Sequence, residues 1–62
     1  MHVKNLKVLR KAAGISGVEF AKMMKVSPIT VYRWEVGERT PTAKHFQKIS
    51  QILNVPMEDL VD

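Results

Sequence analysis

Residues 16–35 read SGVEFAKMMKVSPITVYRWE, and two helix start signals lie close together in this stretch. Ser16 and Glu19 have the spacing of a capping box, in which each side chain satisfies a free backbone N–H of the other residue. Ser27 followed by Pro28 is a second start signal, because serine caps helices and proline fits the first helical position. The stretch therefore predicts two consecutive helices.

The connection between these two helices is very short. Only Lys25 and Val26 lie between Met24 and the second cap. Helices 17–24 and 28–35 joined by so tight a turn cannot lie antiparallel, so we expect them to cross at a steep angle, as in a helix-turn-helix.

Helices are also predicted on both sides of this pair. One covers 4–13 and ends at Gly14 as a left-handed cap. Another covers 43–53, with Thr42 as its N-cap and Asn54 as a left-handed C-cap. Pro56 opens a last short helix. No strand pattern is present, so we expect one compact all-α domain of five helices over residues 1–62. Its core positions are Leu6, Leu9, Ala13, Phe20, Ala21, Met24, Val31, Trp34, Phe46, Ile49, Ile52 and Leu53.

The composition excludes several classes of protein. The chain has 62 residues, enough for one small domain, and no cysteine, so disulfides and thiolate metal sites are excluded. No apolar run approaches the length of a membrane span, and residues 1–5 do not resemble a signal peptide, so a cytoplasmic location is expected. His2 and His45 lack partners at ligand spacing, and we expect no metal or cofactor. No catalytic set can be assembled, which argues against an enzyme.

The charge is basic and unevenly distributed. Ten Lys and Arg against six Asp and Glu give a net charge of +4. Glu58, Asp59 and Asp62 gather at the C-terminus, so the rest of the chain is more basic still. This balance suits a polyanionic partner, although many small domains are basic for solubility alone.

The stretch 16–35 resembles the helix-turn-helix of the Cro and phage-repressor (XRE-like) family. The matching positions are Ile15-Ser16, Phe20-Ala21, Val26-Ser27, Thr30-Val31, Trp34-Glu35, Gly37 and Pro41, with Arg10 upstream and Leu53, Val55 and Leu60 downstream. The resemblance implies a lambda-repressor-like DNA-binding fold. It also implies a sequence-specific regulator, most simply a repressor, that binds double-stranded DNA as a homodimer on a palindromic operator.

The outer face of the predicted helix 28–35 carries the residues expected to contact bases, which are Pro28, Ile29, Tyr32 and Arg33. A purely solvated face explains the arginine but not an exposed isoleucine beside a tyrosine. In the family, this helix enters the major groove. There an arginine can bond guanine with both arms, and an aliphatic side chain can pack on a thymine methyl group.

A second set of residues is expected to contact phosphates. Hydroxyls, positive charges and helix N-termini all bind phosphate, although a capped helix beside a solvated loop would look the same. The set is Gly17, Ser27, Thr30, Arg39, Thr40, Thr42 and Lys44.

The resemblance also assigns structural roles. Arg10 and Glu35 are expected to form an internal ion pair between the first and third helices, with both arms of the arginine on the carboxylate. The dimer contact is expected near the last helix, at Val55, Pro56, Met57, Leu60 and Val61, with Met57 and Leu60 on one face.

Four positions depart from the family pattern. Gly17 stands where glutamine often braces the recognition helix, Lys25 where the turn has glycine, Pro28 where a side chain often contacts a base, and Val36 where asparagine is common. Antitoxins and phage-encoded partner proteins use the same scaffold to bind other proteins. Ile29 and Tyr32 could then be anchors in a protein partner's pocket, with DNA binding secondary.

Overall fold

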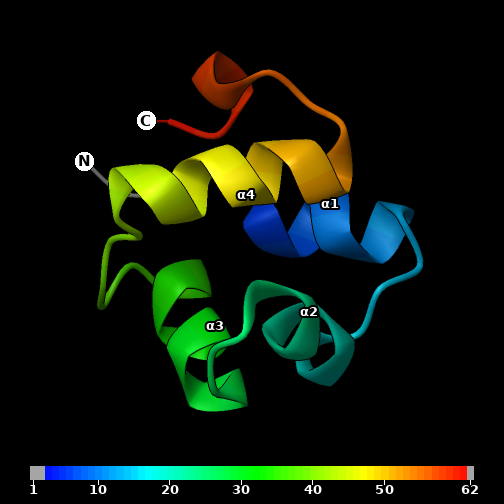
Figure 1. Ribbon diagram of the computed structural model, residues 1–62, viewed down its shortest axis with the longest axis vertical. Coiled ribbons are helices and arrows are strands. Elements are labelled where there is room, and N and C mark those ends of the chain that lie inside the picture. The colour runs from blue at the N-terminus through cyan, green and yellow to red at the C-terminus, as the bar shows by residue number, and fades with distance from the viewer. Residues whose placement is uncertain (1–2, 62) are drawn as a thin grey trace.

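The computed structural model describes residues 3–61 as four α-helices and one 3-10 turn. The helices are α1 (Leu6–Ala12), α2 (Gly17–Met24), α3 (Pro28–Glu35) and α4 (Ala43–Leu53), and the turn is η1 (Met57–Asp59). In Figure 1, α2 and α3 lie below α4 and α1, and η1 lies on the far side of α4 from α3. No helix among these residues is long and apolar enough to cross a membrane.

The helix-turn-helix forms as its start signals predict. Ser16 and Glu19 make both hydrogen bonds of the capping box. The backbone N–H and the hydroxyl of Ser16 hold the pKa of Glu19 below its ordinary value. The contact therefore stabilises the fold at neutral pH and is lost as the pH falls through that lowered pKa. Lys25 ends α2 with a left-handed φ of 60°.

The cap of α3 differs from the expectation. Ser27 is the N-cap residue, but its side chain caps no backbone N–H. Its hydroxyl lies 2.9 Å from the hydroxyl of Thr30 instead. Thr42, in contrast, caps α4 as predicted, since its hydroxyl accepts a hydrogen bond from the backbone N–H of His45. The left-handed caps Gly14 and Asn54 are also as predicted.

The predictions for the first and the last helix are wrong. The first helix begins at Leu6 and not at Lys4, because Asn5 has a left-handed φ of 59° that no α-helix tolerates. Ala13 was expected in the core and is exposed. The predicted fifth helix is only a 3-10 turn, because the chain must place Leu60 in the core three residues after Met57.

The core joins all the elements. Phe20 and Ile49 are completely buried, and Trp34 is 3% exposed. At the ends of the chain, Val3 and Val61 form an isolated antiparallel bridge, and the N–H of Lys4 donates to the carbonyl of Leu60 at 2.8 Å. This bridge holds residues 3 and 61 beside one another.

Candidate nucleic-acid interface

The outer face of α3 is exposed along its length. Val31 and Trp34 fill the core side, so the 3.6-residue period turns the remaining positions outward. The exposed fraction is 50% for Ile29 and 55% for Tyr32. Pro28 is exposed and Arg33 is half-buried at the edge of the same face. This arrangement presents two large apolar side chains and a guanidinium together.

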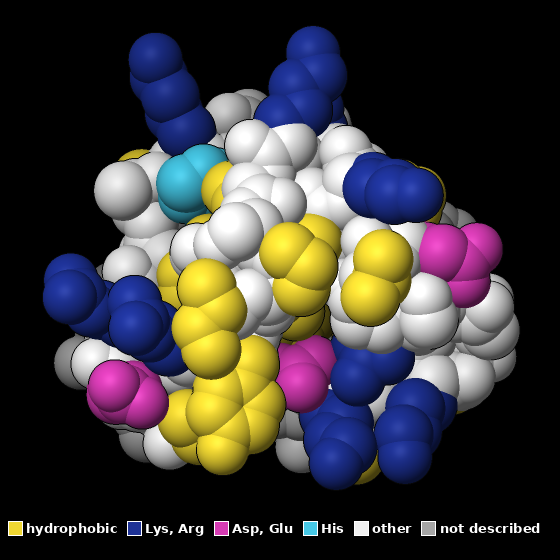
Figure 2. Space-filling model, turned by 90° about the horizontal axis from the view of Figure 1, so that it is seen from below, with side chains coloured by type: hydrophobic (Ala, Val, Ile, Leu, Met, Phe, Trp, Pro, Cys, Tyr) yellow, Lys and Arg dark blue, Asp and Glu magenta, His cyan; other side chains and the backbone are white. Residues whose placement is uncertain are grey.

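The side of the molecule that carries α2 and α3 has a basic margin. Figure 2 looks at this side from below and shows hydrophobic side chains from its middle to its lower edge, with Lys and Arg around much of the edge and a few acidic side chains among them. The exposed acidic residues Glu58 and Asp59 belong to η1, beyond α4 (Figure 1). Asp62 lies outside the described residues. Glu58 and Asp59 thus lie beyond α4, away from the basic margin.

Arg10 holds the C-terminal end of α3 through Glu35. Its Nε donates to Glu35 Oε2 at 2.9 Å, and both side chains are about nine-tenths buried. Its Nη1 donates to the carbonyl of Ile15 at 2.9 Å. The expected pairing of both arms with the carboxylate is therefore wrong, because the second arm holds the segment between α1 and α2. One guanidinium thus joins α1, the entry to α2 and the end of α3.

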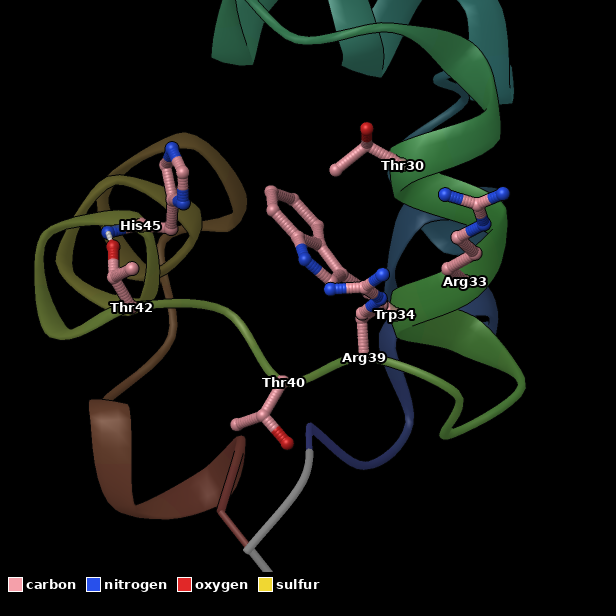
Figure 3. Close-up of a pocket in the computed structure, with 7 residues that line it drawn as sticks. All are labelled: Thr30, Arg33, Trp34, Arg39, Thr40, Thr42 and His45. Atoms are coloured by element: carbon pink, nitrogen blue, oxygen red, sulfur yellow. Dashed lines mark hydrogen bonds between the residues drawn. The ribbon is translucent and has the colours of Figure 1, made fainter.

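A hollow of about 330 Å³ opens between α3 and the start of α4. Figure 3 shows its lining residues, which come from α3, from the loop after it and from the first turn of α4. The His45 and Trp34 rings meet inside it, with centroids 5.1 Å apart and a tilt of 49°. The lining consists of Thr30, Arg33, Trp34, Arg39, Thr40, Thr42 and His45.

The hollow brings together four of the seven residues expected to contact phosphate, namely Thr30, Arg39, Thr40 and Thr42. The other three lie outside it. Gly17 is the first residue of α2, Ser27 precedes α3, and Lys44 is exposed on α4.

Two lining residues were not anticipated from the sequence. Trp34 was assigned to the core alone, and His45 was considered only as a metal ligand. The spacing of His45 from Thr42 was a usable signal for its place in the first turn, because the backbone N–H of the third residue after an N-cap donates to the capping side chain.

The predicted dimer patch is partly wrong. Leu60 is completely buried, so it belongs to the core of the monomer and does not share a surface with Met57. Val55 and Val61 are partly buried and pack against the same core. Pro56 is exposed and Met57 is 40% exposed. The surface that remains is smaller than the sequence predicted.

The described residues hold no group of three or more His, Cys, Asp or Glu side chains that could bind a metal ion. His2 lies outside them.

Comparison with known proteins agrees with this geometry. A family model described as Helix-turn-helix (HTH_3) matches residues 6–60, nearly the whole chain. A search of curated proteins found no match. The family consists of DNA-binding regulatory domains and is not typically enzymatic. The match covers all four helices and η1, and so the chain belongs to the XRE/Cro-repressor-like helix-turn-helix family of DNA-binding domains.

Proposed function

We propose that this protein is a sequence-specific regulator of transcription, most simply a repressor, that binds a palindromic operator as a homodimer. The observation that carries the proposal is the outer face of α3. Ile29 and Tyr32 are each at least half exposed, and Arg33 follows Tyr32 on the same helix. Leaving such apolar side chains in water is unfavourable unless a partner covers them.

The recognition step follows from this face. B-DNA has a major groove about 12 Å wide that admits one α-helix. With α3 in the groove, Arg33 donates to guanine O6 and N7 while Ile29 packs on a thymine methyl group. Arg39 and the hydroxyls beside it then face the flanking phosphates, which fix register without adding sequence information.

The size of the domain supports a dimer. Its longest extent is 24 Å, shorter than the 34–36 Å that separates equivalent half-sites one helical turn apart. One copy therefore covers one half-site, and two copies are needed for useful specificity in a genome. We place the contact at the exposed Pro56 and Met57, flanked by Val55 and Val61.

A protein-binding role on the same scaffold is the second candidate. The exposure of Ile29 and Tyr32 also suits anchors in a partner's pocket. Salt separates the two roles. DNA binding weakens steeply with salt because phosphates release counterions, whereas an apolar protein interface does not.

The test is a selection from random duplex sequences with the purified protein. We expect enrichment of a two-fold symmetric site whose half-sites lie about 10 base pairs apart. Sedimentation with the selected duplex should then give two proteins per duplex. Failure to enrich any sequence, together with salt-insensitive capture of a protein, would favour the second candidate. A single protein per duplex at saturation would rule out the dimer.

A further inference from the structure

The hollow between α3 and α4 has the chemistry of an anion site. Arg33 and Arg39 line it, and no carboxylate does so among residues 3–61. Guanidinium groups match the geometry of phosphate and sulfate oxygens and make charge-assisted hydrogen bonds to them. Thr30 also lines the hollow, but its hydroxyl is paired with that of Ser27 and points away from Trp34 and His45 (Figure 3).

The start of α4 contributes further donors to the same hollow. The Thr42 hydroxyl caps the N–H of His45, and the carbonyl of Thr42 accepts from Phe46. The N–H groups of Ala43 and Lys44 lie in the first turn, where a helix supplies no acceptor. Together with the positive end of the helix dipole they favour a bound anion, but a helix start alone does not make a site.

The side chain of Trp34 is the independent observation. It is only 3% exposed, and its indole N–H can only donate. The indole N–H makes no hydrogen bond to any described residue. If it were fully buried, it would be a buried nitrogen without a partner, and the described residues contain none. The indole N–H must therefore be open to the hollow that it lines. Figure 3 shows the ring nitrogen on the side turned towards Thr42 and His45.

The contact with His45 keeps the indole in this position. The two rings meet at 5.1 Å with a tilt of 49°, a favourable arrangement for aromatic rings. Packing in the core holds the rest of the indole, so the N–H is oriented before any ligand arrives. A preoriented donor loses little conformational freedom on binding.

We propose that this hollow holds one tetrahedral oxyanion and that the indole N–H of Trp34 is one of its donors. This identification rests on the proposed function: in the complex with DNA, the oxyanion is a phosphate of the DNA backbone. Trp34 is thereby a ligand-contacting residue as well as a core residue. Because the site is formed without DNA, it also binds free sulfate.

The experiment uses the single tryptophan of the chain, which gives one indole N–H signal in a ¹H–¹⁵N spectrum. Sodium sulfate is titrated at constant ionic strength, and the operator duplex in a separate series. We expect the indole signal to move in both series, saturably for sulfate. Arg39→Ala should weaken sulfate binding roughly tenfold, as for the loss of one charge-assisted hydrogen bond. Lys7→Ala, which removes an equal charge from α1, should change it less than about twofold.

The outcomes separate this inference from the proposed function. If the duplex binds and the indole signal does not move, the Trp34 contact is wrong while DNA binding stands. If sulfate moves the signal saturably but no duplex binds, the anion site stands and the proposed function fails. A shift that never saturates and is equal in Arg39→Ala and Lys7→Ala would overturn the site. Trp34→Phe, once its fold is checked by circular dichroism, should lower duplex affinity roughly tenfold.

Discussion

Arg10 Nε donates to Glu35 Oε2 at 2.9 Å, across 25 positions of the sequence. The same guanidinium holds the carbonyl of Ile15 through Nη1. The C-terminal end of α3 is therefore held by a side chain that also bonds the segment leading into α2. The same group therefore helps to hold α2 and α3 at their angle, together with the core between them.

We predict that Arg10→Met destabilises the protein more than Arg10→Met combined with Glu35→Leu. Removing one partner leaves a buried carboxylate unpaired, which costs about 3–5 kcal/mol, whereas replacing both can be neutral. The double variant still loses the bond to Ile15, about 1 kcal/mol. Urea unfolding of the three proteins measures both effects. Equal and additive losses for the two single variants would contradict the coupling.

We predict opposite effects of alanine at two glycines. A Cβ at Gly17 would lie 4.0 Å from Arg10 Cζ, an ordinary contact, and no positive φ is required there. Gly17→Ala should therefore stabilise the fold by about 0.4–1 kcal/mol. Gly37 has open space but a φ of +80°, so Gly37→Ala should destabilise it by roughly 1–2 kcal/mol. Thermal melts compare the pair, and a stabilising Gly37→Ala would refute the backbone argument.

We predict that Arg33→Ala lowers affinity for the selected operator by roughly 1–3 kcal/mol and relaxes preference at one base pair of each half-site. That base pair should be G·C. The measurement is a binding series over operators with each base pair changed in turn. Arg33 also lines the hollow, so an equal loss on specific and random duplexes would assign it to phosphate alone.

We predict that Arg39→Ala and Lys44→Ala each weaken binding to every sequence alike. Each should reduce the slope of log affinity against log salt by about one unit, since one phosphate contact is lost. Lys7→Ala serves as a control, because Lys7 is exposed on α1. If neither variant changes the slope, the phosphate contacts lie elsewhere.

We predict that Met57→Glu leaves a folded monomer and weakens binding to a two-half-site operator more than to a single half-site. Met57 is 40% exposed, so the charge is solvated in the monomer, but it repels its copy in a dimer. Leu60→Ala is the contrast. Leu60 is completely buried, and its truncation should cost about 2–5 kcal/mol of stability. An equal loss for Met57→Glu on both duplexes would exclude this contact.

Local signals in the sequence were enough for the centre of the fold. The starts of α2, α3 and α4 follow from the local signals Ser16, Ser27-Pro28 and Thr42, which act within one helical turn. The ends of the chain were not predictable in this way. Asn5 and η1 take their conformations because residues 3 and 61 pair and Leu60 enters the core, and such contacts between distant positions leave no local pattern.

The same contrast applies to the candidate site. The outer face of α3 follows from the helical period, because burial of Val31 and Trp34 turns Ile29 and Tyr32 outward. The hollow could not be predicted, since it depends on how the start of α4 is placed against α3. Trp34 shows the limit most clearly. The helical spacing of the sequence assigns Trp34 to the core. Only the structure shows that one edge of its ring lines the hollow.

The bridge between Val3 and Val61 has a practical consequence for protein engineering. Because Val3 and Val61 are adjacent, a short glycine-rich linker can join the chain near these two residues, and new ends can be opened in an exposed loop. The last described segment, red in Figure 1, lies on the far side of α4 from α3, so a label attached there lies away from α3. A circularly permuted chain opened at Glu38 would instead place its new ends beside the hollow, where a fluorophore reports on anything that occupies it.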